Sequence, residues 1–396
     1  MINLLRKKKV FSRIGELSLI SLIIAVGVSL IDTIWAVYLY GFLGSAVKVG
    51  LLSALFTMVS LLSFIFLIPF IEKHDKSMLY AWALFFSAIC YLIFGFTHSL
   101  WVIVLLGVLL SFLMVVRMDS FGLILRDCSQ LDELAKNEGI LYTAVNLGWL
   151  VGPLLAAFIA DRYGIPLVFM LSAFFLFLAL LTFKFFRVSG KCRAKKQLDG
   201  NFLKNIKDHF KNKDMLKTYI LAGSMGTWWS FIYIYVPLYI IENGLGVKWV
   251  SFFLFAVVIP LLVLEYPFAK IAETLHYKPL FIAGNILLAI VSISVFFVTN
   301  IYAQLFLLIC GGIGIAMIEA TTEAYFFLIA PKKRLEKYYS VYNTHIDVFP
   351  VLAKLLVAGV LSLFAFRYSF LAMALFFVFF TIVAFQLREV SAKTNI

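Results

Sequence analysis

Charged side chains are scarce in this 396-residue chain: Asp, Glu, Lys and Arg make up 14% of it, against 63% for hydrophobic residues. So few charges leave too little polar surface to keep a chain of this length dissolved in water. The scarcity therefore excludes a soluble globular protein. It predicts a protein embedded in a lipid bilayer.

Cysteine and histidine are also scarce, with four and five residues respectively. The cysteines fall within apolar spans or in loops predicted to face the cytosol, so we expect no disulfide framework. The histidines are scattered without the spacing of metal ligands, and no Gly-Lys-Ser/Thr nucleotide-binding loop is present. We therefore predict no metal, no cofactor and no enzymatic activity.

What the sequence has in abundance is apolar runs of about 20 residues, the length that crosses a hydrocarbon core of roughly 30 Å. The first run follows a basic stretch, as in a signal peptide, but it is too long and lacks a small-residue cleavage site, so we expect it to be retained. Twelve runs predict an all-α polytopic membrane protein: 15–42, 46–71, 78–97, 100–125, 140–161, 164–186, 216–241, 248–269, 279–299, 302–329, 340–363 and 366–387.

Basic residues are distributed unevenly between the loops. Because positively charged loops stay in the cytoplasm, we place both termini there, in a plasma or inner membrane. The formal net charge of +13 then reflects basic inner loops near anionic lipid, and we expect no nucleic-acid binding. With this orientation the basic residues outside the inner segments are the outer Lys48, Arg162, Lys248 and Arg367 and the embedded Arg117 and Lys354.

Two stretches of the first part of the chain are echoed in the second. The sequence "VYLYGFLGSAVKVG" (37–50) resembles "VPLYIIENGLGVKWV" (236–250), and "PFIEKHDK" (69–76) resembles "PFAKIAETLHYK" (267–278). These echoes predict two six-helix pseudo-repeats of the same orientation. Parallel repeats of this kind are typical of one large class of secondary transporter.

A basic segment separates the two repeats. We predict a first half over 1–186, a basic cytoplasmic linker over 187–215 and a second half over 216–396. The simplest interpretation of the linker is a segment that its positive charge holds near the membrane surface.

Acidic and basic residues recur in the loops that follow the second helix of each repeat. Glu72, Lys73 and Lys76 lie in the first copy, and Glu273 and Lys278 lie in the second. With this loop, the chain resembles the major facilitator superfamily over essentially its whole length. In that family a Gly-x-x-x-Asp-Arg-x-Gly-Arg pattern in this loop latches neighbouring helices, which the resemblance implies for these five residues.

Two further motifs carry the resemblance. "RMDSFG" (117–122) is similar to the family's Arg-x-x-x-Gly element, with Arg117 in the basic role. In "GWLVGPLLAA", Gly148, Gly152 and Pro153 match a sequence associated with drug/proton antiporters. Small residues at that spacing also let helices pack closely, so the antiporter interpretation and ordinary packing both stay open.

In the family, the first, fourth, seventh and tenth helices line a central cavity. Asp32 could there bind a cation or proton, or simply neutralise Arg117, and the aromatic residues could equally pack in the core. Glu265, outside these helices, is interpreted as part of the loop latch. The resemblance implies these cavity residues: Asp32, Trp35, Arg117, Asp119, Trp228, Trp229, Tyr233, Glu319 and Glu323.

The two glutamates of "IEATTEAYFF" (318–327) are four positions apart and therefore share a helix face. Two like charges at low dielectric favour protonation. We hypothesise that Glu319 carries a coupling proton or binds a cationic group, with Glu323 tuning it. The alternative is that Arg117 or Lys354 neutralises one of the acids.

These features together predict a secondary active transporter that moves a small molecule by alternating access. The expected activity is export of an amphipathic compound coupled to protons, or to sodium. One alternative is an uptake carrier for a sugar, organic acid or peptide, with Arg117 holding a substrate anion. Another is a non-transporting membrane scaffold or receptor. We expect a monomer whose partners are its substrate, its coupling ion and the lipid bilayer.

Overall fold

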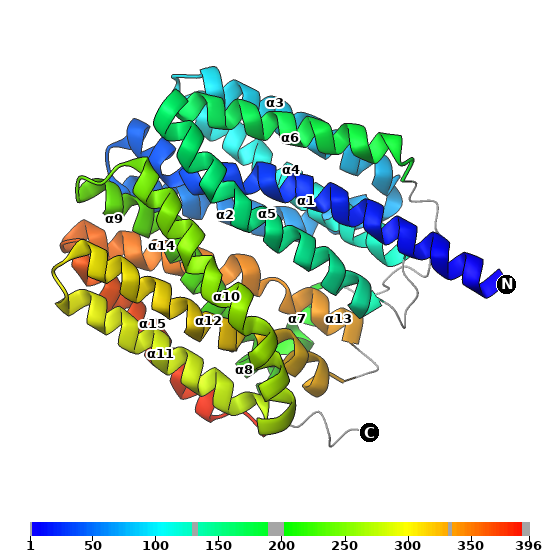
Figure 1. The fold of residues 1–396 in the computed structure, drawn as a ribbon. Helices are drawn as coiled ribbons and strands as arrows, with labels where there is room; N and C mark the ends of the chain where they lie inside the picture. Colours follow the sequence, from blue (N-terminus) through cyan, green and yellow to red (C-terminus); the bar gives the residue numbers. More distant parts are fainter. Residues whose placement is uncertain (1, 129–133, 189–201, 332–334, 390–396) are drawn as a thin grey trace. The chain divides into compact units, whose positions relative to one another are not determined.

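The computed structural model describes residues 2–128, 134–188, 202–331 and 335–389, and all regular structure in these ranges is helical (Figure 1). In chain order the elements are α1 (Ile2–Leu43), α2 (Ala46–Lys73), α3 (Lys76–Phe96), α4 (Leu100–Cys128), α5 (Leu134–Tyr163), α6 (Ile165–Phe185), α7 (Phe202–Lys211), α8 (Lys213–Ser230), the π-helical η1 (Phe231–Tyr235), α9 (Val236–Glu242), α10 (Val247–Leu275), α11 (Tyr277–Phe297), α12 (Ile301–Ile329), α13 (Leu335–Tyr342), α14 (His345–Leu363) and α15 (Arg367–Phe385).

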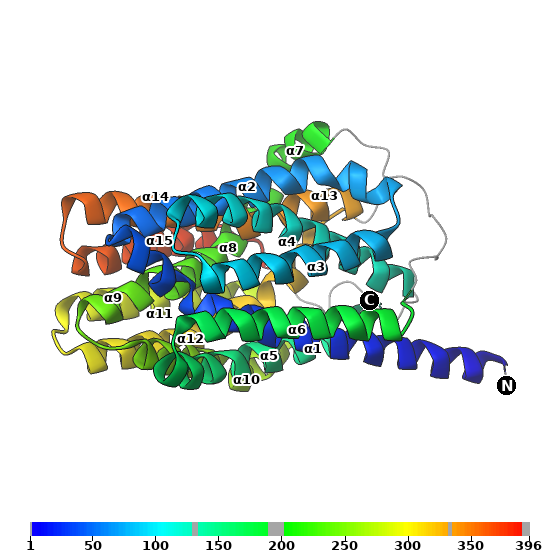
Figure 2. The same cartoon turned by 90° about the horizontal axis from the view of Figure 1, so that it is seen from above.

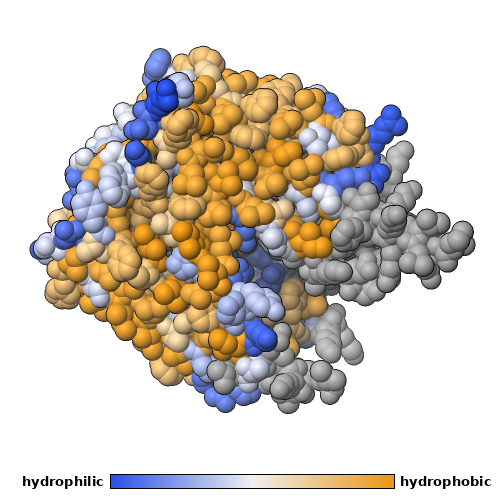
Figure 3. All heavy atoms as spheres, viewed as in Figure 1, coloured by the Kyte–Doolittle hydropathy of each residue, from blue (hydrophilic) through white to orange (hydrophobic). Residues whose placement is uncertain are grey.

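Eleven of the described helices are long and apolar enough to cross a membrane. The remaining predicted span, 216–241, is divided: its residues lie in α8, η1 and α9. The prediction of an all-α, twelve-span membrane fold is confirmed. Large apolar side chains such as Phe66, Trp101 and Phe185 are exposed, and apolar residues cover most of the face shown in Figure 3, as expected of a surface in contact with lipid.

Backbone contacts divide the chain into two compact units. Unit 1 comprises Met1–Tyr38 and Val59–Gln197, and unit 2 comprises Leu39–Met58 and Leu198–Ile396. The predicted halves 1–186 and 216–396 stay a prediction. The predicted linker 187–215 contains the helix α7, and its residues 189–201 lie outside the described part.

In unit 1, α3 packs against α6 and α4, and α5 packs against α6 (Figures 1 and 2). Helix α1 approaches α6 at Gly27, where an added Cβ would lie 2.9 Å from the Cβ of Phe175. The Ser172 hydroxyl donates to the Gly27 carbonyl oxygen over 2.6 Å. Small and hydroxyl-bearing residues therefore bring α1 and α6 together, as is typical of membrane helices.

In unit 2, α12 packs against α10, α11 and α8, and α15 packs against α11. Glycines set the closest approaches. A Cβ on Gly284 of α11 would lie 2.7 Å from the Gly314 carbonyl oxygen, and one on Gly312 would lie 2.8 Å from the Val257 carbonyl oxygen of α10. These contacts fix the height of α12 against both neighbours.

Polar residues cap the helices at short turns. Asp75 accepts hydrogen bonds from the backbone of Ser77 and Met78 at the start of α3, and Asn300 does the same for α12. Gly164, between α5 and α6, has φ +86°, a conformation that side chains rarely adopt. Asp75 therefore has a local structural role in the loop after α2.

Candidate functional site

The acid closest to the middle of α12 lies beside a tryptophan. Glu319 is half-buried, and its Oε2 accepts a long hydrogen bond of 3.5 Å from the Trp229 indole nitrogen of α8. The Tyr233 ring lies 5.9 Å from that of Trp229. The structure thus brings together three of the predicted cavity residues, from α8, η1 and α12.

The π-helical segment η1 begins two residues after Trp229 and contains Tyr233. A π segment holds one more residue in its turn than an α-helix, and such segments occur frequently at functional sites. Tyr233 lies inside η1, and Pro237 follows in the first turn of α9. The π-helical interruption of this membrane span therefore coincides with the predicted cavity residues Trp229 and Tyr233.

The neighbouring Trp228 points elsewhere. Its side chain is 1% exposed, and it packs against Phe377 with ring centroids 6.0 Å apart. An added Cβ on Gly311 would also touch this indole, at 3.0 Å from Cζ2. Trp228 therefore lies in the packed interior of unit 2 and is not brought to Glu319 with Trp229.

Glu323 has different surroundings from Glu319, although the two share a helix. Its side chain is exposed, and the hydroxyl of Tyr339 from α13 donates a hydrogen bond to it. One turn of α12 thus separates an embedded acid from one near the end of the helix. Although the two acids were predicted to share a helix face, their side chains have different partners.

The sequence analysis assigned Glu265 to the loop latch and did not relate it to Glu319. This half-buried residue lies on α10, the helix that packs most extensively on α12. Glu265 and Glu319 therefore lie on two helices that pack against each other. The second acid near Glu319 therefore comes from a different helix, and only the packing of α10 on α12 could have revealed it.

In unit 1, an acid and a base act on one tyrosine. Asp32 of α1 and Arg117 of α4 are half-buried, and the charges of both act on the Tyr91 hydroxyl of α3. Arg117 also acts on Tyr80, one of the largest fully buried side chains. Tyr91 therefore joins the predicted residues Asp32 and Arg117 in one polar group.

The other two predicted residues of unit 1 have separate surroundings. Trp35 packs against Phe94 and Tyr38, with ring centroids 5.5 Å and 6.1 Å away. Asp119 is half-buried, with Oδ2 shielded from solvent. Trp35 thus belongs to an aromatic cluster beside the polar group.

The small residues of α5 face α1. A Cβ on Gly148 would lie 2.9 Å from the Val26 backbone nitrogen, and one on Gly152 would overlap the Ser29 hydroxyl. That hydroxyl donates to the Gly148 carbonyl oxygen over 3.1 Å. Pro153 is buried next to them. This geometry serves close helix packing, whatever else the motif does.

The predicted latch is described only in part. Lys73 is exposed at the end of α2, and Lys76 and Lys278 are half-buried at the starts of α3 and α11. The side chains of Glu72 and Glu273 lie outside the described part. The latch therefore stays a prediction.

Lys354, a predicted alternative neutraliser of the α12 acids, is 9% exposed. Its ammonium group donates to the Thr57 hydroxyl over 2.7 Å. The Tyr235 hydroxyl donates to its carbonyl oxygen over 2.5 Å. Within unit 2, Lys354 thus joins α14 to the start of α2 and to η1.

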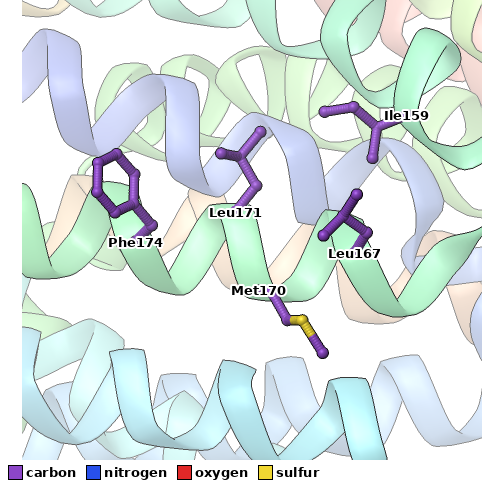
Figure 4. A pocket seen from close by; sticks show the side chains of 5 residues that line it. All are labelled: Ile159, Leu167, Met170, Leu171 and Phe174. Atoms are coloured by element: carbon purple, nitrogen blue, oxygen red, sulfur yellow. The ribbon is translucent and has the colours of Figure 1, made fainter. Parts of the chain in front are cut away.

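A shallow pocket between α5 and α6 is not a polar site. It is lined only by apolar side chains, shown in Figure 4: Ile159, Leu167, Met170, Leu171 and Phe174. Among the side chains described, no three His, Cys, Asp or Glu residues are grouped as metal ligands would be. The candidate residues therefore form two separate groups, one in each unit: Asp32, Arg117 and Tyr91 in unit 1, and Glu319, Trp229 and Tyr233 in unit 2.

Membrane-spanning helices that carry embedded acids and bases on a scaffold of repeats are typical of secondary transporters. The family model of the Major Facilitator Superfamily matches residues 17–264 and 250–396. The chain belongs to the Major Facilitator Superfamily. The resemblance inferred from the loops and repeats is confirmed, and secondary transport of a small molecule across a membrane follows from it.

Several known proteins are similar to the chain. An uncharacterized MFS-type transporter of Methanocaldococcus jannaschii is 21% identical over 267 residues, 67% of each chain. A bacterial homolog of the human lysosomal transporter Spinster, inward-facing and occupied, matches with TM-score 0.75, 12% identity and coverage of 95% and 96%. A POT family transporter in complex with a thioalcohol-conjugated peptide matches with a TM-score of 0.79 and 11% identity. The match covers 95% of this chain and 96% of that chain. The last two likenesses concern the fold alone.

Proposed function

We propose that the chain couples export of a small amphipathic molecule to proton movement, with Glu319 as the residue that carries the proton. The observation that supports this most is the setting of Glu319, which is half-buried within an apolar helix and hydrogen-bonded by a neutral indole. Burial of a carboxylate in hydrocarbon is costly, so such a group readily takes up a proton. A site that changes charge in this way can couple proton movement to transport.

The aromatic pair beside Glu319 suits the proposed substrate. Trp229 and Tyr233 present flat apolar rings next to a carboxyl group, and Trp and Tyr faces attract cations. A molecule with an apolar body and a positive group would contact both parts. Proton release from Glu319 would then favour substrate binding, and proton uptake would favour its release.

The polar group of unit 1 belongs to the same proposal. Asp32, Arg117 and Tyr91 lie on helices that the family uses for its cavity, or beside them. Export rather than uptake rests on the Gly148, Gly152 and Pro153 motif. The uptake alternative, with Arg117 holding a substrate anion, predicts the opposite direction in the same assay, and sodium coupling predicts dependence on sodium instead of pH.

Transport in inverted membrane vesicles tests the proposal. A panel of amphipathic cations, sugars, organic acids and peptides is offered with and without an imposed proton gradient. We expect accumulation of an amphipathic compound when the vesicle interior is acidic. Glu319→Gln should keep substrate exchange between the two sides but abolish accumulation driven by the gradient.

Glu323→Gln is the matched control, because it removes the same charge one turn away on the same helix. It should retain gradient-driven accumulation, with at most an altered rate. Full gradient-driven transport by Glu319→Gln at normal expression would remove this residue from the coupling step.

The membrane orientation is part of the proposal. Tags after Lys196 and Lys333 should be protected from reagents added outside intact cells, and a tag near Lys48 or Arg162 should be accessible. Labelling at position 196 from outside would overturn the cytoplasmic placement of the central segment. We also expect a monomer in a plasma or inner membrane.

A further inference from the structure

We propose that Glu265 and Glu319 share a single proton across the contact between α10 and α12, so that Glu265 is the second acid of the site. This rests on the proposed function only in taking Glu319 as the proton carrier. The step needs no other reactant: the proton bonds to one carboxyl oxygen, and the other carboxylate keeps its charge. The pair then carries one negative charge instead of two.

The positions of the two acids along the axes of α10 and α12 support a shared proton. Helices α10 and α11 are joined through His276 alone, and α11 and α12 through Val298–Asn300, so α10 and α12 run in the same direction. They touch at Gly312, where an added Cβ would lie 3.2 Å from the Cβ of Pro260. This contact provides a common reference level.

Glu265 lies five positions beyond Pro260, and Glu319 lies seven positions beyond Gly312. At a rise of about 1.5 Å per residue, the acids lie about 7.5 Å and about 10.5 Å past the contact. Their levels therefore differ by only about 3 Å on adjacent helices, as a shared proton requires.

The electrostatics agree with this placement. Two carboxylates that share a site cannot both ionise cheaply, because each charge opposes the other. They take up protons in coupled steps that belong to the pair. Both residues are half-buried, so the repulsion is screened less than it would be on an exposed surface.

Other elements packed on α12 contribute few ionisable groups near this level. Helix α8 contributes the uncharged Trp229, with its Lys and Asp residues in its first turns, and α11 carries Lys278 at its start. On α12 itself, Glu323 and Tyr325 lie one to two turns further on.

A titration of the purified full-length protein in lipid nanodiscs, without substrate, tests the sharing. Trp229 touches Glu319, so its fluorescence should change when that acid gains a proton. The difference between wild type and Glu319→Gln isolates this change from the other tryptophans. Trp229→Phe should abolish the difference.

Glu265→Gln should move the midpoint of this titration downward by about one pH unit, because the repulsion that favours the shared proton is gone. Glu265→Met, which suits the apolar helix, should give the same shift if the glutamine variant folds poorly. Glu265→Asp retains the charge and should shift the midpoint less than half as far. Glu323→Gln, the control on α12, should leave it in place.

Two outcomes would overturn the inference: a midpoint unchanged in both neutral variants at position 265, or an equal shift in Glu323→Gln. The readout is independent of transport, so it separates the two proposals. A shift without gradient-driven transport would keep the shared proton and reject proton-coupled export. Gradient-driven transport without a shift of the midpoint would keep proton-coupled export and reject the shared proton.

Discussion

Unit 1 carries an acid and a base near one tyrosine, Asp32 and Arg117 beside Tyr91, whereas the pair proposed for unit 2 consists of two acids, Glu265 and Glu319. Asp32 and Arg117 have opposite charges and lie near the same tyrosine, Tyr91, so their charges can offset one another. In the pair proposed for unit 2, Glu265 and Glu319 would carry like charges that repel, and the neutral Trp229 lies beside Glu319. An offset pair is stable while ionised, but a like-charged pair is relieved by a proton. We therefore expect the stability of unit 1 to fall when one of its two charges is removed. We expect the stability of unit 2 to rise when one of its two acids becomes neutral.

The largest expected effect comes from disrupting the contact between α5 and α1, the helix that carries Asp32. Gly152→Val should destabilise the protein by about 3 kcal/mol, since the side chain would overlap Ser29 and approach the Leu30 backbone nitrogen, 3.2 Å from an added Cβ. Thermal unfolding in nanodiscs measures this. Gly122→Val is the matched control, because nothing lies within 4 Å of a Cβ there. Equal effects of the two variants would show that the contact between α5 and α1 carries no special constraint.

Removing the base of unit 1 should have the next largest effect. Arg117→Leu leaves Asp32 without its offsetting charge, and we expect a loss of about 2–3 kcal/mol, below the 3–5 kcal/mol typical of a fully buried pair because Arg117 is half-buried. Adding Asp32→Asn should recover part of it in the same unfolding assay. Arg162→Leu, at an exposed position, is the control. No recovery in the double variant would mean that Asp32 and Arg117 do not interact.

A pH effect outside the membrane must be separated from that of the acid pair. Burial lowers the pKa of His209 in α7 to about 4, and its ring packs on Tyr338 and Tyr219. The folded state therefore holds His209 neutral. Its contribution to stability is present above about pH 6.5, the pKa of an unfolded histidine, and is lost as the pH falls toward 4.

The expected loss between pH 7 and pH 5 is about 2 kcal/mol of unfolding free energy. His209→Phe should remove this pH dependence, while His74→Phe, at an exposed position, should keep it. Unfolding of each variant at the two pH values measures the difference. A pH dependence that survives in His209→Phe would have to come from another group.

The smallest expected effect has the opposite sign from that of Arg117→Leu. Glu319→Gln should stabilise the protein by about 1 kcal/mol at pH 8, because it removes one of two repelling charges. Glu323→Gln, on the exposed side chain held by Tyr339, should change stability by less than about 0.5 kcal/mol. Destabilisation by Glu319→Gln under these conditions would show that its charge is offset in the folded protein.

The sequence predicted the fold well because hydrophobic length and loop charge act locally. Each apolar run became a helix, with two exceptions: 216–241 was divided by η1, and 340–363 begins in α13 and continues in α14. Nothing in the composition of "FIYIY" distinguishes a π turn from an α turn. The helix α7 was missed because its residues look like a charged linker, and only packing on α8 and α13 orders them.

The candidate site was predictable residue by residue but not in its pairings. Acids embedded in apolar runs are conspicuous, so Glu319 and Asp32 were found. Glu265 was given another role because 54 positions separate it from Glu319, and a sequence does not show which helices touch. Trp228 and Trp229 are neighbours in sequence that point about 100° apart on a helix, so one packs in the interior and the other meets the acid.

The extra residue in η1 divides one membrane crossing into two parts with separately set directions. Each residue added to a helix rotates everything beyond it by about 100°. Deleting one residue between Phe231 and Tyr235 would leave the crossing almost as long, yet would turn Pro237 and Glu242 to a different side while Trp229 kept its place. The segment beyond η1 can therefore diverge in sequence without disturbing the contact between Trp229 and Glu319.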